Sequence, residues 1–178
     1  EKLILPGVGH FDHAMGELVN SGMLDTLNEL VLEKMLPIIG ICVGMQMMAN
    51  SSDEGTSEGL KWIDATVKKF DETKIRQVTR LPHMGWNDAY PVVTNPLFEG
   101  LEKDALFYFL HSYYFDCKNA EDVIAVSDYG DRFTCAANHG NVYGIQFHPE
   151  KSHKYGEKLL NNFAKLFINN VFMILEIG

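Results

Sequence analysis

The chain has few cysteines and no long apolar run, and each shortage argues against a class of protein. Only Cys42, Cys117 and Cys135 occur among 178 residues, and no two of them are spaced as a CxxC pair. Neither a disulfide framework nor a zinc ribbon is therefore expected, and a reducing, cytoplasmic compartment fits best. Since no apolar segment approaches the roughly 20 residues that span a bilayer, no membrane association is predicted.

Basic residues are also scarce, because 15 lysines and arginines stand against 24 aspartates and glutamates, a formal net charge of −9. Binding to a nucleic-acid backbone depends on clustered basic side chains that release counterions, so no nucleic-acid partner is expected. Lys68-Lys69 and residues 151–158 are the two basic concentrations. Neutral or acidic residues interrupt both, and we interpret both as solvated surface. No metal and no cofactor is predicted.

The order of apolar patterns predicts an α/β fold in one domain over residues 1–178. Short continuous apolar runs at 3–5 and 36–41 are typical of strands buried on both faces of a parallel sheet. Between them, residues 11–34 show the apolar spacing of a helix that breaks near residues 21–22. A further helix is expected from about 45 to 50.

The second half of the chain is rich in strands. Residues 134–138 and 142–147 are expected to pair as a hairpin across 139–141. Further strands are predicted over residues 65–70, 76–80, 107–109, 113–115 and 123–127. A final amphipathic helix carries Leu159, Leu160, Phe163, Leu166 and Phe167. Together these patterns imply a mostly parallel central sheet with an antiparallel extension.

Residues 40–44, Gly-Ile-Cys-Val-Gly, have the form of a nucleophile elbow, in which a reactive side chain stands at a sharp turn from strand to helix. Cys42 would then stand at a helix N-terminus, where the positive end of the helix dipole favours a thiolate. The N–H of Val43 would be free to stabilise an oxyanion. The alternative is a buried structural cysteine beside two packing glycines.

A second motif, Gln-Phe-His-Pro-Glu at 146–150, could complete a catalytic triad. In extended backbone, residues two apart point to the same side, so His148 and Glu150 are predicted to lie together. A carboxylate that holds an imidazole in one tautomer is the orienting half of such a triad. An exposed histidine beside an exposed glutamate is the alternative, and the cysteine elbow upstream argues against it.

These two motifs resemble those of the class I glutamine amidotransferases, a family with a flavodoxin-like three-layer fold. The resemblance rests on Gly-Ile-Cys-Val-Gly-Met-Gln at 40–46 and His-Pro-Glu-Lys at 148–151. Three more segments are similar to the glutaminase subunits of imidazole glycerol phosphate synthase: Leu-Pro-Gly-Val-Gly at 5–9, Pro-His-Met-Gly-Trp-Asn at 82–87 and Phe-Leu-His-Ser-Tyr-Tyr at 109–114. The match covers residues 3 to about 167.

The resemblance implies a reaction and a role for each matching residue. Cys42 would attack the carboxamide carbon of glutamine, with His148 relaying protons and Glu150 orienting His148. Ammonia leaves, and water hydrolyses the thioester to glutamate. The N–H groups of Val8 and Val43 would form the oxyanion hole. The residues implied to hold glutamine are Gly7, Gln46, His111, Ser112 and Tyr113.

The same resemblance implies a heterodimer in which ammonia passes to a partner. That partner is a (β/α)8-barrel cyclase that makes imidazole glycerol phosphate and AICAR in histidine biosynthesis. Met84, Trp86 and Lys151 would face it. In the family, the loop around Val8 reorients when the partner binds its own substrate, and the flanking glycines lower the strain of such a peptide flip.

The sequence departs from the family pattern at its start. The family begins with a strand and a Gly-Asn-containing loop before the segment that opens here at Glu1, so the first strand–helix–strand is expected to be absent. An internal strand edge would then be exposed. Val43 replaces the leucine more usual after the cysteine, which matters little where only its amide acts.

Four other functions stay open on the sequence alone. A paralogous amidotransferase could feed ammonia to a surface-polysaccharide sugar synthase, and another glutaminase of the class, such as the anthranilate synthase subunit, would share the triad. A non-catalytic binding subunit would be expected to have lost a triad member, and none is lost. A hydrolase acting on peptides or γ-glutamyl chains would have no use for the cyclase-facing motifs.

Overall fold

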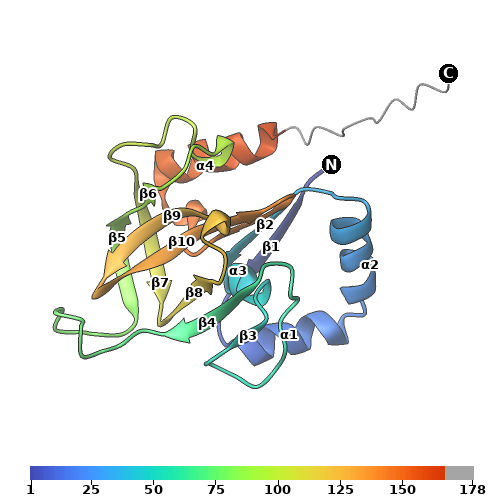
Figure 1. Ribbon diagram of the computed structural model, residues 1–178, viewed down its shortest axis with the longest axis horizontal. Helices are drawn as coiled ribbons and strands as arrows, with labels where there is room; N and C mark the ends of the chain where they lie inside the picture. The colour runs from blue at the N-terminus through green and yellow to red at the C-terminus, as the bar shows by residue number, and fades with distance from the viewer. Residues whose placement is uncertain (167–178) are drawn as a thin grey trace.

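In the computed structural model, which describes residues 1–166, a curved mixed sheet runs through the centre and helices lie on both of its faces (Figure 1). Its main path runs β1-β2-β11-β10-β8-β4-β3, with β9 beside β10 and β6 beside β9. The strands are β1 (Leu3–Gly7), β2 (Ile38–Cys42), β3 (Ser51–Ser52), β4 (Ala65–Lys69), β6 (Tyr90–Pro91), β8 (Tyr113–Cys117), β9 (Val123–Tyr129), β10 (Asp131–His139) and β11 (Val142–Ile145).

Parallel pairing is centred on β2, which lies between β1 and β11. From β11 to β4 the sheet continues antiparallel, because β10 pairs with β11 in the expected hairpin and then with β8 and β9, and β8 pairs with β4. The short β3 at the edge pairs in parallel with β4. Two further strands, β5 (His83–Asp88) and β7 (Leu106–His111), form a separate antiparallel pair. The predicted α/β fold with an antiparallel extension is confirmed.

The helices occupy the positions that the apolar spacing predicted, with shifted ends. They are α1 (Phe11–Asn20), α2 (Leu24–Asn28), α3 (Val43–Met47) and α4 (His153–Lys165), and a π-helical turn (Glu29–Glu33) continues α2. Residues 21–23 interrupt the first helical segment as expected. Short 3₁₀ turns occur at Pro96–Phe98, Ala120–Asp122 and Pro149–Lys151. Across residues 1–166, no helix combines the length and the apolar character that a membrane crossing needs.

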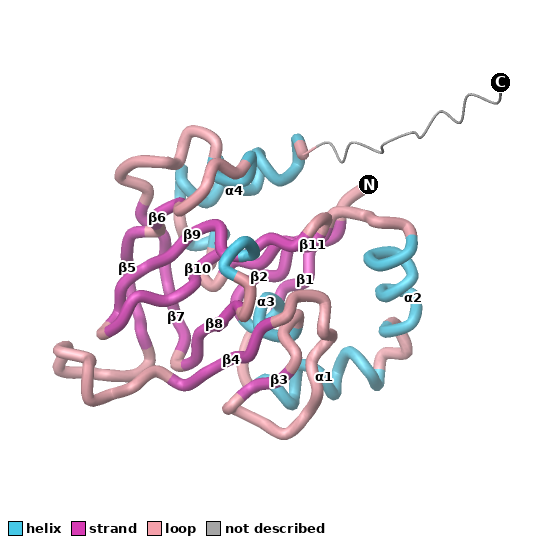
Figure 2. The backbone as a smooth tube through the Cα atoms, in the orientation of Figure 1, coloured by secondary structure: helices cyan, strands magenta, loops and turns pink. Residues whose placement is uncertain are grey.

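Neighbouring residues of the central strands enter two different cores, which makes the fold three-layered. On β2, Ile39 packs in the core that contains Leu159 and Phe163 of α4. Its neighbour Ile38 packs on the opposite face with Met45 of α3. This period of two is the pattern of a strand covered on both faces. Figure 2 shows α4 on one side of the sheet and α1 and α2 on the other.

The structure differs from the sequence predictions in several details, among them the short strands β3 and β6, which were not predicted. Residues 76–80 are an exposed loop, because their one apolar side chain, Val78, has no partner face to bury against. The strand β5 was not predicted, since its glycine and asparagine residues weaken a strand pattern. The last helix ends at Lys165, so Leu166 caps it from outside, and Phe167 lies beyond the described residues.

Candidate active site

The chain makes a sharp turn from strand to helix at Cys42. This residue ends β2 and has φ 55° and ψ −114°, a conformation that L-residues rarely adopt. Holding a non-glycine residue there costs on the order of 1–3 kcal/mol, and the surroundings must impose it. A Cβ on Gly44 would stand 1.8 Å from the Leu5 carbonyl oxygen, and one on Gly40 would stand 2.7 Å from the Gly44 oxygen. Glycines therefore let β1, β2 and α3 approach closely enough to impose the turn.

The Cys42 thiol is buried, and its environment favours the protonated form. The residue is 5% exposed, and its sulfur lies 3.9 Å from the Leu110 carbonyl oxygen and 3.8 Å from Gln146 Nε2. Burial raises the pKa of Cys42 to about 11, and the Val43 amide opposes this only in part. The expected thiolate is thus wrong for this state, because burial outweighs the N-terminus of a five-residue helix. A nucleophilic Cys42 needs a base.

His148 is held by a carboxylate in the manner that a base requires. Its Nδ1 lies 2.7 Å from Glu150 Oε1. Because a carboxylate can only accept, Nδ1 carries the hydrogen of the neutral ring and Nε2 is left with a lone pair. The sequence argument predicted this contact for the wrong reason, since Glu150 lies in the 3₁₀ turn Pro149–Lys151 rather than in extended backbone.

Ser152, which the sequence reasoning did not single out, fixes the backbone of His148. Its hydroxyl is fully buried, donates to the His148 carbonyl at 2.6 Å and accepts from the Tyr108 amide at 3.0 Å. The His148 amide in turn donates to the Tyr108 carbonyl at 2.8 Å. These three bonds attach the turn that carries His148 to strand β7.

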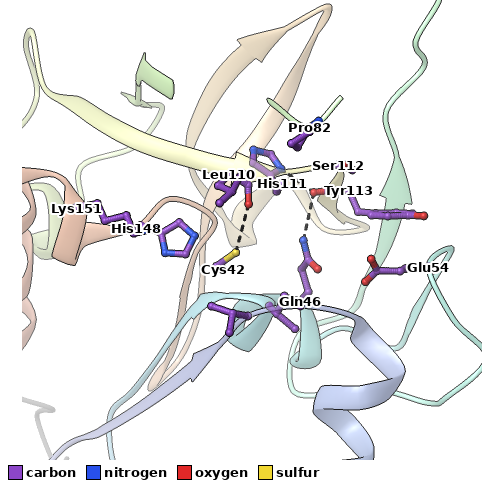
Figure 3. Close-up of a pocket in the computed structure, with 13 residues that line it drawn as sticks. Cys42, Gln46, Glu54, Pro82, Leu110, His111, Ser112, Tyr113, His148 and Lys151 are labelled. Atoms are coloured by element: carbon purple, nitrogen blue, oxygen red, sulfur yellow. Dashed lines mark hydrogen bonds between the residues drawn. The ribbon is translucent and has the colours of Figure 1, made fainter. Parts of the chain in front are cut away.

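Cys42 and His148 line one pocket of about 300 Å³. Figure 3 shows the imidazole beside the sulfur, with the 110–113 segment across the opening. Of the other predicted site residues, those that also line this pocket are Val8, Val43, Gln46, His111, Ser112, Tyr113 and Lys151. Gly7 is not in the lining; it lies against the start of α3, where a Cβ would stand 2.5 Å from the Gly44 nitrogen.

Among residues 1–166, Glu54 is the one acidic side chain in the pocket lining, and no motif pointed to it. Its Oε2 accepts the Phe11 amide at 2.8 Å, which joins the loop after β3 to the start of α1. Figure 3 shows this carboxylate on the opposite side of the opening from His148. The pocket therefore has a negative group at one end and the cysteine and histidine at the other.

Val8 belongs to an open loop beside the pocket. Its side chain is 75% exposed, and the following Gly9 has φ +90°, a conformation open to glycine. A Cβ on Gly9 would meet no atom within 4 Å. The backbone around Val8 thus has room to turn a peptide N–H toward or away from the pocket.

The remaining predicted residues lie on the β5–β7 pair. Met84 and Trp86 are 62% and 47% exposed, and they stand opposite Leu110 and Tyr108 in the register. Lys151 Nζ lies 5.6 Å from the Tyr108 ring centroid. An exposed apolar surface therefore adjoins the pocket. Within residues 1–166, no group of three or more His, Cys, Asp or Glu side chains is arranged to hold a metal ion.

The family model described as glutamine amidotransferase class-I matches residues 2–166. The chain belongs to this family. As a class I glutamine amidotransferase, it shares its fold with solved members at low identity: a crystal structure of a glutamine amidotransferase superposes with a TM-score of 0.66 at 21% identity, over 92% of this chain and 79% of that one.

Two curated relatives are much more similar in sequence. The imidazole glycerol phosphate synthase subunit HisH of Bdellovibrio bacteriovorus is 54% identical over 165 residues, covering 93% of this chain and 81% of the relative. The protein of the same name from Leptospira borgpetersenii is 51% identical over 166 residues, with the same two coverages.

Proposed function

We propose that this amidotransferase is the glutaminase subunit of an imidazole glycerol phosphate synthase, and that it supplies ammonia to a cyclase in histidine biosynthesis. One observation carries the chemistry: Cys42, on a strained elbow, shares a pocket with His148, whose tautomer Glu150 sets. The HisH relatives, at 51–54% identity over most of the chain, favour this pathway over a surface-sugar synthase.

The proposed reaction begins with proton transfer from the neutral Cys42 thiol to His148 Nε2. As the proton leaves, the sulfur attacks the carboxamide carbon of glutamine and its carbonyl oxygen becomes an oxyanion. The amides of Val43 and Val8 donate to that oxygen. His148 returns the proton to the departing nitrogen, and ammonia leaves. His148 then takes a proton from water, which attacks the thioester, and returns that proton to the Cys42 sulfur as the C–S bond breaks and glutamate is released. Glu150 stabilises the imidazolium in both steps.

The pocket also offers groups for the α-amino and α-carboxylate ends of glutamine. Glu54 supplies the negative charge that an ammonium group needs. Ser112 and Tyr113 line the same end of the opening and offer donors to the carboxylate. Gln46 lies between them and Cys42, and its Nε2 is already engaged with the Tyr113 carbonyl at 3.2 Å. Its amide oxygen is the atom left for the substrate.

Replacing Glu54 with glutamine is expected to raise the KM for glutamine about 10- to 100-fold, because a hydrogen bond to a charged group is lost. The kcat should change much less. The side-chain amide oxygen of the new glutamine can still accept the hydrogen bond from the Phe11 amide, which preserves the loop after β3. Steady-state glutamate formation measures both constants. Glu58, an exposed partner of Lys61, gives the matched control Glu58→Gln. An unchanged KM in Glu54→Gln would remove this residue from the substrate site.

The cyclase partner is proposed to dock on the β5–β7 face. Met84 and Trp86 give that face an exposed apolar centre, and Lys151 lies beside it at the pocket. A (β/α)8-barrel docked there would receive ammonia released next to Cys42. Docking would also bring the partner close to the loop around Val8, which offers a means of coupling glutaminase activity to the partner's ligand.

The three cysteines are free thiols, in keeping with a reducing compartment such as the cytoplasm.

The experiment that tests this function measures glutamate formation with and without the histidine-pathway cyclase and its ribonucleotide substrate. Strong stimulation is expected only when both are present, with the Cys42→Ala variant as the blank. Activity that ignores this cyclase would assign the glutaminase to a different synthase. No activity under any condition would favour a non-catalytic binding subunit.

A further inference from the structure

Two buried histidines contact each other beneath the pocket. His83 of β5 and His111 of β7 stand opposite in the register, with His83 Nδ1 3.0 Å from His111 Nε2. His83 is stacked between Phe109 and Tyr129, at ring-centroid distances of 4.8 Å and 4.0 Å. Burial holds the pKa of His83 down at about 4. It lowers that of His111 to about 3, with the neighbouring His83 adding to the effect. Both rings are therefore neutral at pH 7.

The atoms around the pair determine where each hydrogen lies. His111 Nδ1 stands 2.7 Å from the Tyr113 carbonyl oxygen, which can only accept, so Nδ1 carries the hydrogen. His111 Nε2 is then an acceptor, and His83 Nδ1 must donate to it. His83 Nε2 is in turn an acceptor for Asn87 Nδ2 at 3.2 Å. The other hydrogen of Asn87 Nδ2 reaches the Asp128 carbonyl at 2.9 Å.

The Tyr113 carbonyl, at which this series ends, also accepts a hydrogen bond from the pocket side. The donor of that bond is Gln46 Nε2, and the second hydrogen of this nitrogen goes to Gln146 Oε1 at 3.1 Å. Gln146 is fully buried, and its own nitrogen lies 3.8 Å from the Cys42 sulfur. The Tyr113 carbonyl therefore joins the histidine pair, through His111, to the glutamine pair, through Gln46. Figure 3 shows the bond from Gln46 to Tyr113, with His111 nearby.

An apolar pair could fill the same space without the desolvation that two buried imidazoles require. What the imidazoles add is a directed bond that fixes the Tyr113 carbonyl, and with it the amide of Gln46. Asn87, at the other end, lies on the strand that carries Met84 and Trp86. A movement of β5 would thus be transmitted to the pocket by bonds that cannot reverse direction without a tautomer change.

We propose that His83 and His111 are positioning residues: as an ordered pair they fix the Tyr113 carbonyl and thereby orient Gln46 for substrate, linking the β5 face to the glutamine pocket. This role rests on the proposed glutaminase function. It makes Asn87 the outer end of the series and the Tyr113 carbonyl, which Gln46 contacts, the inner end. Neither imidazole touches the reacting atoms.

Two substitutions of His111 separate positioning from packing. In His111→Asn the amide nitrogen can replace Nδ1 and still donate to Tyr113, whereas in His111→Gln the amide sits where Nε2 was and the donor is lost. We expect His111→Gln to raise the KM for glutamine about five- to tenfold with a smaller change in kcat. His111→Asn keeps the donor to Tyr113 but loses the acceptor for His83 Nδ1, so it should raise the KM by a clearly smaller factor. His139→Asn and His139→Gln, at an exposed histidine that contacts Asp122, are the matched controls.

A merely structural histidine would give a different result. Both His111 variants would then lower the melting temperature and kcat together and leave KM unchanged, and that outcome overturns the proposal. Equal KM increases in both variants overturn it as well, because only one of them lacks the donor.

A third variant changes Asn87, the half-buried residue at the outer end of the series, and leaves both buried histidines in place. Asn87→Asp places a carboxylate against His83 Nε2, which draws the hydrogen to that nitrogen and removes it from Nδ1. The KM for glutamine should rise, and Asn161→Asp on the exposed face of α4 should leave it unchanged. An unchanged KM in Asn87→Asp would contradict the series.

Nitrogen-15 NMR of histidine-labelled protein at pH 7.5 measures the tautomers directly, and the measurement does not depend on glutaminase activity. Both His83 and His111 are expected as neutral rings with the hydrogen on Nδ1, and Asn87→Asp should move the hydrogen of His83 to Nε2. A hydrogen on Nε2 of either ring in the unmodified protein overturns the proposal. Correct tautomers together with an inactive protein would instead mean that the proposed function fails while the hydrogen-bond series stands.

Discussion

Replacing Cys42 with alanine should abolish glutamate formation while leaving the complex with the cyclase intact. Removing a nucleophile that acts as a unit with its base lowers turnover by at least about 10⁴-fold. The loss is expected to be total in practice, because no other thiol lines the pocket and the remaining cysteines lie in strands β8 and β10. The free energy of unfolding should change little or fall slightly, because the substitution keeps the strained elbow and removes only the buried thiol.

The matched control is Cys117→Ala, which removes a partly buried thiol on β8, outside the pocket lining. Ammonium salts added to the Cys42→Ala complex should restore product formation by the cyclase, since free ammonia bypasses the glutaminase. Glutamate production above background in Cys42→Ala would show that another group attacks glutamine. Loss of cyclase binding in that variant would mean that the elbow, and not only its thiol, had been altered.

The sequence was informative wherever chemistry depends on a short stretch of backbone. The elbow at 40–44 could be predicted because glycines on both sides of a cysteine have few other uses between a buried strand and a helix. The contact between His148 and Glu150 could be predicted because their separation is two residues, whichever local conformation joins them. The layers of the fold followed from continuous apolar runs in the central strands and helical spacing beside them.

Contacts between distant segments could not be predicted in this way. Glu54 reaches the pocket because its carboxylate accepts an amide 43 residues earlier in the chain, and nothing near Glu54 signals this. Ser152 bonds a backbone amide on β7, which a local pattern cannot reveal. The protonation of Cys42 also depended on the whole surroundings, because burial by distant segments outweighs the local helix terminus.

Replacing Gly44 with alanine should unfold or severely destabilise the protein. The new Cβ would stand 1.8 Å from the Leu5 carbonyl oxygen and 2.8 Å from its carbon, and neither backbone atom can rotate away. Either β1 or α3 must move, so the free energy of unfolding should fall by about 3 kcal/mol or more, at or above the upper end of overpacking effects. Denaturant titration measures this, and glutaminase activity should be lost together with the geometry of Cys42.

Gly16 supplies the matched control, because it lies inside α1 and a Cβ there would meet nothing within 4 Å. Gly16→Ala should raise the free energy of unfolding by about 0.5–1 kcal/mol, since alanine favours the helix and restricts the unfolded chain. A lower free energy of unfolding in Gly44→Ala together with a higher one in Gly16→Ala would show that the protein has no general intolerance of alanine. The close packing of α3 on β1 would then be what holds the elbow in its strained form. Equal stability of Gly44→Ala and the unmodified protein would mean that the β1–α3 contact is looser than 1.8 Å implies. In that case the conformation of Cys42 would have to be maintained from the β2 side, where Gly40 meets the Gly44 carbonyl.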